Sequence, residues 1–217
     1  MDSILEVRNL NLDIPQRRLF SNLSFDIPKG KLTCITGENG VGKTTLTKYI
    51  LRHLKKDPDH ISLAIDPDRV QYIPQLRSID NDYPLSIKDF VNLGFKHRIL
   101  PWNSRQMNQT RAKILEDTNL KKIAHQSLGT ASGGEKQRAY LAQALCADPK
   151  LLIMDESTAN LDWSSKHELL KLLKKIIPQR DLTVMFITHD PELIEQYGDY
   201  ELHLANQSGT LTKKEED

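Results

Sequence analysis

The chain has 217 residues, of which 38% are hydrophobic, 27% charged and 6% aromatic, a balance typical of a globular domain that buries its own core. Its 30 Lys and Arg residues nearly equal its 29 Asp and Glu residues, and the net charge of +1 gives no general attraction to nucleic acid or anionic lipid. With two cysteines, no secretion signal at its start and no apolar run near the ~18 residues of a membrane span, the chain is expected to be neither secreted nor membrane-spanning.

The first third of the chain predicts two paired strands, followed by a buried strand and a helix. Short, partly alternating apolar runs at residues 5–12 and 23–27 indicate antiparallel strands at the margin of a sheet. Residues 31–36 form an apolar run that predicts a buried strand. After a glycine-rich loop, residues 44–54 have apolar side chains at helical spacing.

The middle of the chain predicts helices. Residues 86–89 match a capping box that opens a short helix, and Gly94 is placed to close it. Residues 103–122 are polar and helix-prone, with a narrow apolar stripe along one side. We therefore expect residues of about 80–130 to form a helical insertion.

In the last third, helices and strands alternate again. Residues 135–146 predict a helix, and residues 151–154 predict a strand that is buried on both faces. An amphipathic helix is expected over residues 166–177, ended by Pro178, and a buried strand over residues 183–188. This alternation predicts an α/β fold with a mostly parallel sheet and an antiparallel β margin.

Residues 37–44 match the pattern G-x-x-x-x-G-K-[ST], placed between the predicted strand and helix. The backbone N–H groups of such a loop surround a phosphate, and the positive N-terminus of the next helix adds to the attraction. The lysine is expected to reach the β- and γ-phosphates, and the threonine hydroxyl to ligate Mg²⁺. The expected nucleotide contacts are Gly37, Glu38, Asn39, Gly40, Val41, Gly42, Lys43, Thr44 and Thr45.

Two carboxylates, Asp155 and Glu156, follow the buried strand of residues 151–154. A carboxylate at the end of a strand beside a phosphate-binding loop can hold Mg²⁺ directly or through water. Glu156 is then placed to orient and polarise the water that attacks the γ-phosphate. Such a run is common by itself, and a solvated strand end is the simpler interpretation; the loop upstream favours the catalytic one.

His189 follows the predicted strand of residues 183–188. A single histidine is usually structural. At this edge of the sheet, however, an imidazole can also hydrogen-bond the γ-phosphate or its water. The position alone leaves both interpretations open.

The residues Ser132, Gly133, Gly134 and Glu135 match a second capping box. The same geometry makes an anion site, because a hydroxyl and bare glycine amides meet at a helix N-terminus. One nucleotide does not need two phosphate-binding helix ends in one chain. The simplest explanation is that this end contacts ATP bound to a second copy of the protein.

Six motifs in order resemble the ATP-binding subunits of ABC transporters, over essentially the whole chain. They are Walker A at residues 37–44, the glutamine loop at 72–75, the signature at 131–135, Walker B with its glutamate at 151–156, the D-loop at 159–162 and the switch histidine in 187–190. The resemblance implies a single ABC ATPase domain over residues 1–217. Its P-loop NTPase (RecA-like) core would take about residues 1–80 and 130–217, with a helical subdomain at about 80–130.

The resemblance also implies a mechanism. Two chains would close head to tail on two ATP molecules with Mg²⁺, each held by Walker A of one copy and by Ser132 and Gly134 of the other. Asp162 of the D-loop would join the nucleotide contacts. Gln75 would contact Mg²⁺ or the attacking water and transmit the nucleotide state to a transmembrane permease. Glu156, His189 and Gln75 are the expected catalytic residues, and Thr44, Gln75 and Asp155 the expected Mg²⁺ ligands.

Three positions depart from the family pattern. Ile14 stands where an aromatic residue often stacks on adenine, so it can pack on the base but offers no π-face. Ala131 replaces a leucine of the signature, and Ser157 replaces the proline after the glutamate. Neither of the last two removes a group from the chemistry.

The stretch from the glutamine loop to Gly94 looks like the corresponding region in ATPases of zinc, manganese and iron importers. The expected protein is therefore an ATPase at the cytoplasmic face of the cell membrane, working with permease subunits and a separate substrate-binding protein, without nucleic acid. An ATPase for another cargo or for export, a soluble ABC ATPase acting on DNA or ribosomes, and a regulator that never hydrolyses ATP are the alternatives. The lack of a long heptad run argues against the second, and Glu156 and His189 against the third.

Overall fold

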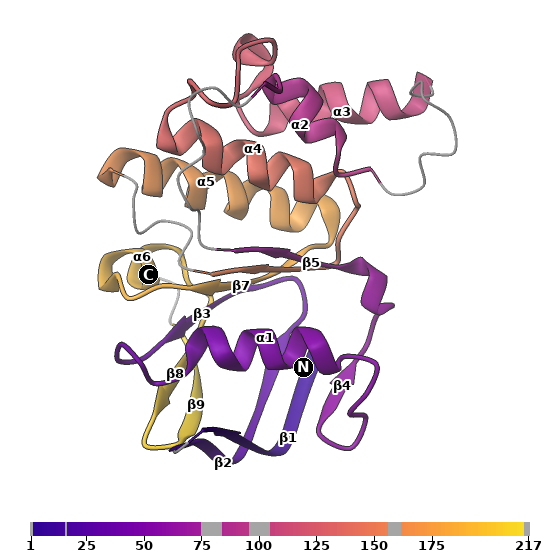
Figure 1. Cartoon of the computed structure of the whole chain (residues 1–217). Coiled ribbons are helices and arrows are strands. Elements are labelled where there is room, and N and C mark those ends of the chain that lie inside the picture. Colours follow the sequence, from indigo (N-terminus) through magenta and orange to yellow (C-terminus); the bar gives the residue numbers. More distant parts are fainter. Residues whose placement is uncertain (1, 16, 75–83, 96–104, 156–161, 215–217) are drawn as a thin grey trace.

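The computed structural model describes residues 2–15, 17–74, 84–95, 105–155 and 162–214. Its elements are stacked in layers (Figure 1). A central sheet lies between a group of helices on one face and a single helix with an antiparallel sheet on the other. None of the helices in these ranges is long and apolar enough to cross a membrane.

The central sheet is mostly parallel, as the sequence predicts. In order across the sheet, its strands are β5 (Val70–Ile73), β6 (Leu151–Met154), β7 (Thr183–Ile187), β3 (Leu32–Thr36), β8 (Tyr200–Ala205) and β9 (Ser208–Lys213). The first five pair in parallel, and only β9 runs antiparallel, in a hairpin with β8. The expected strands at residues 31–36, 151–154 and 183–188 are confirmed as β3, β6 and β7.

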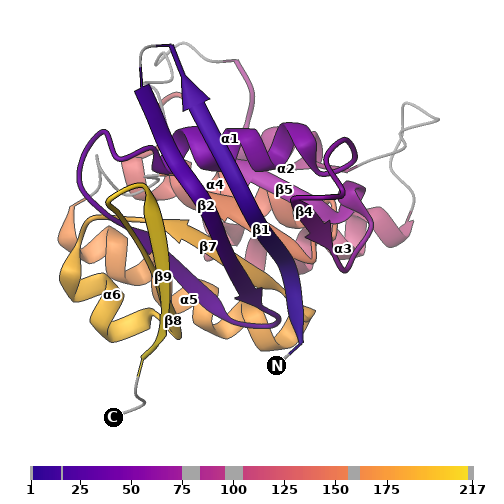
Figure 2. The same cartoon turned by 90° about the horizontal axis from the view of Figure 1, so that it is seen from below.

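The antiparallel margin is a separate three-stranded sheet. Its order is β2 (Arg17–Pro28), β1 (Ser3–Ile14) and β4 (Ile61–Leu63). The long β1–β2 hairpin runs beneath the central sheet (Figure 2). β1 and β2 have 12 residues each, longer than the apolar runs that predicted them, because exposed polar residues continue the pairing at the hairpin tip.

Six α-helices complete the described part of the chain. They are α1 (Lys43–His53), α2 (Ile87–Asn92), α3 (Arg105–Asp117), α4 (Gly133–Leu145), α5 (Trp163–Arg180) and α6 (Pro191–Tyr197), with single 3₁₀ turns at Pro67–Arg69 and Lys121–Ile123. α4 and α5 cover the face of the sheet opposite α1, and α2 and α3 lie beyond α4 (Figure 1). Residues of the expected insertion therefore form the outermost helical layer.

The central strands separate two apolar cores, because neighbouring side chains of a strand point to opposite faces. Leu152 and Met154 pack with the helices above the sheet. Leu151 and Ile153 pack with α1 and the antiparallel sheet below it. All four side chains are completely buried, which explains why β6 has an uninterrupted apolar sequence.

Two of the predicted helix boundaries carry the expected caps. Ser86 accepts a hydrogen bond from the N–H of Asp89 and begins α2, but instead of completing a capping box, the Asp89 carboxylate accepts a hydrogen bond from the Ser86 hydroxyl. Ser132 and Glu135 exchange the two hydrogen bonds of a capping box at the start of α4. The prediction that Pro178 ends the preceding helix is wrong: α5 continues to Arg180. A proline in the last turn removes only one helical hydrogen bond, and the helix instead ends where Asp181 adopts a left-handed conformation.

Candidate functional site

Residues that the sequence predicts to be functional gather where parallel strands end. β3 lies beside β7 with Ile35 opposite Ile187, and β6 lies on the other side of β7. The carboxyl ends of these three strands therefore share one edge of the sheet. The phosphate loop (residues 37–42) follows β3 directly, Asp155 follows β6 directly, and His189 is the second residue after β7.

The phosphate loop needs glycine for both conformational and steric reasons. Gly37, Gly40 and Gly42 have φ angles of 135°, 81° and 113°, in the left-handed region that residues with a Cβ rarely adopt. At Gly37, a Cβ would also lie 2.4 Å from the carbonyl oxygen of Leu204 in β8. The spacing of the motif is therefore set by how the chain turns from β3 into α1.

α1 begins at Lys43, so the N–H groups of its first turn point toward the loop without intrahelical partners. The Lys43 side chain is 5% exposed. Its Nζ donates hydrogen bonds of 2.7 Å and 3.0 Å to the carbonyl oxygens of Gly37 and Glu38. A buried cation is thus held against the loop, beside the positive end of a helix, which favours a phosphate there.

Thr44 and Asp155 meet although 111 residues separate them in the sequence. The Thr44 hydroxyl donates to Oδ1 of Asp155 over 3.0 Å. Asp155 is 3% exposed, and its Oδ2 accepts a hydrogen bond of 3.0 Å from the Tyr72 hydroxyl. A hydroxyl and a carboxylate in contact are hard oxygen donors of the kind that Mg²⁺ prefers, so the residues present fit this ion.

His189 is exposed at the end of β7, and both of its neighbours are hydrogen-bonded. The N–H of Thr188 donates to the carbonyl of Ile35 over 3.2 Å, and the Thr188 hydroxyl accepts from the N–H of Asp190 over 3.1 Å. Lys166 of α5 donates to the Asp190 carboxylate over 3.2 Å. The backbone that carries His189 is therefore held at two points.

Ser132, Gly133, Gly134 and Asp162 lie at the starts of two neighbouring helices. Ser132 is the exposed N-cap of α4, and Asp162 is the exposed N-cap of α5. Gly134 packs against Ser165 in the first turn of α5. Both helices belong to the layer on the opposite face of the sheet from α1 (Figure 1).

A pocket of about 860 Å³ opens beside the phosphate loop. Its lining comes from the loop, the start of β2 and the β8–β9 hairpin: Arg17, Arg18, Leu19, Glu38, Asn39, Val41, His203, Leu204, Ala205, Asn206 and Gln207. Ile14 is 38% exposed at the end of β1, where it pairs directly with Arg17. The sequence carries no motif for the pocket residues of the hairpin, since they meet the loop only through the β3–β8 pairing.

The structure thus brings together Thr44, Asp155 and the loop residues, and it places His189 at the same edge of the sheet. Glu156 and Gln75 lie outside the described residues. Tyr72 was not predicted as a site residue; the one signal for it in the sequence is its place three residues before Gln75.

Relatives with assigned names match most of the chain. A manganese transport system ATP-binding protein, MntB, of Halalkalibacterium halodurans is 31% identical, over 95% of this chain and 85% of the relative. A zinc import ATP-binding protein, ZnuC, of Rickettsia bellii is 32% identical, over 86% of this chain and 76% of the relative.

Solved structures agree in fold. An inward-facing putative metal-chelate type ABC transporter superposes with a TM-score of 0.82 at 26% identity, covering 98% of this chain and 84% of that one. CbiO1 of Clostridium perfringens, part of the ABC transporter complex cbiONQ, superposes with a TM-score of 0.84 at 26% identity, covering 99% and 89%. The family model described as ABC transporter matches residues 20–159. The chain therefore belongs to the ABC transporter family, as an ATP-binding and ATP-hydrolysing subunit.

Proposed function

We propose that this subunit hydrolyses ATP to drive the import of zinc or manganese ions through a separate membrane permease. The observation that carries the ATPase site is the hydrogen bond between Thr44 and Asp155, which joins Walker A to Walker B. The support for the cargo is that relatives covering most of this chain are named as zinc and manganese transport proteins.

In the proposed site, Lys43 and the N–H groups at the start of α1 bind the β- and γ-phosphates. Thr44, Asp155 and Gln75 hold Mg²⁺, which would supply positive charge to the phosphate oxygens when bound. Ile14 packs on the adenine without stacking, and the pocket beside the loop offers room for the nucleoside.

The proposed hydrolysis is direct attack by water. Glu156 orients the water and draws off its proton as the oxygen bonds to the γ-phosphorus, while the bond to the β–γ bridging oxygen breaks and ADP leaves. His189 donates a hydrogen bond to the γ-phosphate or to the water. The hydrogen bonds on both sides of His189 support this role, because they hold its backbone at the correct edge of the sheet.

The signature residues act on a second copy in this proposal. Ser132, Gly133, Gly134 and Asp162 contact ATP held by the partner's Walker A. Their place supports this arrangement, since α4 and α5 begin with exposed N-caps and belong to the layer on the opposite face of the sheet from α1. Closure on two ATP molecules would then be the step that the permease senses.

The proposal places the subunit peripherally at the cytoplasmic face of the cell membrane, with permease subunits and a separate substrate-binding protein. It keeps the chain as one ATPase domain, with a core of about residues 1–80 and 130–217 and a helical subdomain of about 80–130. No nucleic acid partner is proposed.

Metal content of whole cells tests the cargo. In the cell that encodes this chain, deleting its gene should lower zinc or manganese content when the metal is scarce. The wild-type gene should restore the content, and a gene carrying Glu156→Gln should not, because ATP would bind without being turned over. A rise in metal content on deletion would indicate export instead, and unchanged metal content would indicate another cargo.

A further inference from the structure

The buried carboxylate of Asp155 has a hydrogen bond on each of its two oxygens. Thr44 donates to Oδ1, and Tyr72 donates to Oδ2, both over 3.0 Å. Tyr72 comes from β5, where it pairs with Ile153, two residues before Asp155. The N–H of Asp155 also donates to the carbonyl of Ile73 over 2.9 Å. Strand β5 thus holds both the backbone and the side chain of Asp155.

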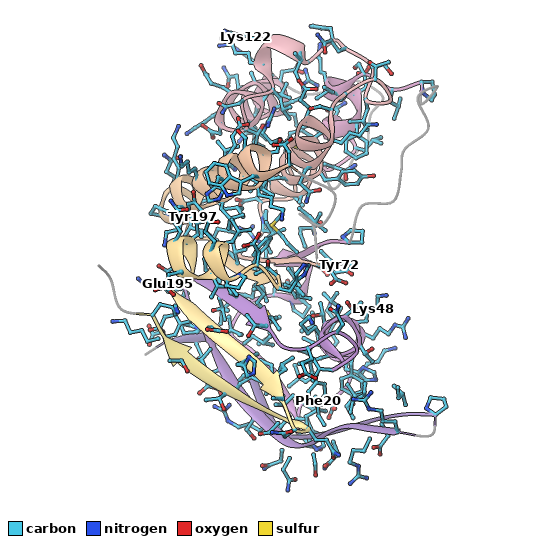
Figure 3. The ribbon with its side chains drawn as sticks, turned by 90° about the vertical axis from the view of Figure 1, so that its left-hand side faces the viewer. Phe20, Lys48, Tyr72, Lys122, Glu195 and Tyr197 are labelled. Carbon is cyan, nitrogen blue, oxygen red and sulfur yellow. The ribbon has the colours of Figure 1, made fainter. Side chains whose placement is uncertain are left out.

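Tyr72 is well suited to remain a donor. Figure 3 shows it at the level of the sheet, between the helices above and α1, which carries Lys48, below. Its side chain is half-buried. A carboxylate can only accept hydrogen bonds, so the Tyr72 hydroxyl is the donor in its contact with Asp155.

We propose that Tyr72 is a positioning residue that sets the orientation of the Asp155 carboxylate for Mg²⁺. The carboxyl torsion of an aspartate is broad and roughly two-fold, so a single hydrogen bond fixes the plane of the carboxylate less well than one bond on each oxygen. With Oδ2 held by Tyr72, Oδ1 is directed at Thr44, the other expected ligand. This inference rests on the proposed roles of Thr44 and Asp155.

The physical reason is the cost of a poorly oriented ligand. Residues that hydrogen-bond a metal ligand typically change metal affinity by about 10–100-fold when they are removed. Substituting Tyr72→Phe keeps the ring and deletes only the hydroxyl. It should therefore weaken Mg²⁺ binding while leaving the phosphate loop and Lys43 intact.

The test is an equilibrium titration of nucleotide binding. A ribose-labelled fluorescent ATP analogue is bound to the purified full chain at a series of Mg²⁺ concentrations and in EDTA. Tyr72→Phe should raise the Mg²⁺ concentration for half-maximal binding by about tenfold. Affinity in EDTA should be unchanged. An unchanged Mg²⁺ dependence, or an equal loss of affinity with and without Mg²⁺, would overturn the proposal.

The chain offers a matched control in Tyr49. Its hydroxyl donates to the Asp57 carboxylate over 3.1 Å, in another tyrosine–carboxylate pair outside the site. Tyr49→Phe should leave the Mg²⁺ dependence at the wild-type value. Wild-type protein that binds no nucleotide would contradict the proposed function itself, whereas normal wild-type behaviour with a silent Tyr72→Phe change would contradict only this inference.

A second variant tests whether Tyr72 acts through Asp155. In an Asp155→Asn background, the further change Tyr72→Phe should have almost no effect on Mg²⁺ dependence, because residues that act through one another are not additive. The same shift in both backgrounds would show that Tyr72 acts by another route. Thermal unfolding of each variant, followed by circular dichroism, confirms that the compared proteins are folded.

Discussion

At the scale of single residues, two constraints require glycine in the phosphate loop: a positive φ angle and close contact with β8. Gly37 and Gly40 both have positive φ angles. A Cβ at Gly37 would meet the Leu204 carbonyl, whereas a Cβ at Gly40 would have no atom within 4 Å. Steric contact with β8 therefore adds to the backbone strain at Gly37 and is absent at Gly40.

We predict that Gly40→Ala lowers the free energy of unfolding by about 1–2 kcal/mol, through the strain of a left-handed alanine alone. Gly37→Ala should cost a further 1–3 kcal/mol or so, because the loop must also move away from β8. Urea unfolding at equilibrium measures both. Equal costs at the two positions would mean that β8 does not constrain the loop.

Local patterns in the sequence predict the residues of the loop but not the residues that surround it. Two local patterns predict Lys43 and Thr44, in the G-x-x-x-x-G-K-[ST] loop, and Asp155, after the apolar run of residues 151–154. Tyr72 and His203 could not be found in that way, since their relation to the site depends on strands β5 and β8 pairing with β6 and β3. Pairings of that kind are long-range and leave no local periodicity.

At the scale of secondary structure, uninterrupted apolar runs predicted the central strands, whereas the hairpin of β8 and β9 was not predicted. β9 was not predicted because it is mostly exposed, and β8 was missed although its buried residues alternate with more exposed ones. Their turn also lacks glycine: Asn206 and Gln207 take the left-handed conformations themselves, with φ angles of 48° and 61°. A sequence rule that looks for glycine in tight hairpins therefore passes over this one.

The start of α5 should respond to acid. Hydrogen bonds from the backbone and hydroxyl of Ser165 lower the pKa of Asp162. A lowered pKa means that this cap stabilises the helix above the ordinary aspartate range, and that the contribution is lost as the pH falls through the folded-state pKa. Trp163, next in the chain, can report the change because its ring lies close to the ring of His167 in the same helix, with the ring centroids 4.0 Å apart and the planes tilted by 38°.

We expect Trp163 fluorescence, measured in a Trp102→Phe variant, to change with a midpoint below the ordinary pKa of aspartate. Adding Asp162→Asn should remove this transition, because an amide does not titrate. Persistence of the transition in the double variant would assign it to another group.

At the scale of the whole molecule, the two halves of the proposed ATP site lie in different layers. The phosphate loop leads into α1, below the central sheet, while the signature begins α4, above it (Figure 1). A chain built in this way is expected to complete its site by pairing with a second copy. Such pairing would change the mass of the protein in solution as well as its activity.

The mass in solution of the Glu156→Gln protein should double when ATP and Mg²⁺ are added. The reason is that two chains would close on ATP, and hydrolysis would not reopen the dimer. A further Ser132→Arg change should prevent the dimer while ATP still binds to the monomer, since Ser132 would contact only the partner's nucleotide. Light scattering after gel filtration measures the mass. Loss of ATP binding by the monomer would place Ser132 at its own chain's site.

The ion pair between Lys166 and Asp190 connects α5 to the segment that follows β7. α5 starts at the cap residue Asp162, and one turn later Lys166 donates a hydrogen bond to Asp190, the residue after His189. Trp163 reinforces the attachment through its hydrogen bond of 3.3 Å to Glu192 in α6. The first turn of α5 thus connects Asp162 with the segment that carries His189, and a tilt of this helix would displace both together.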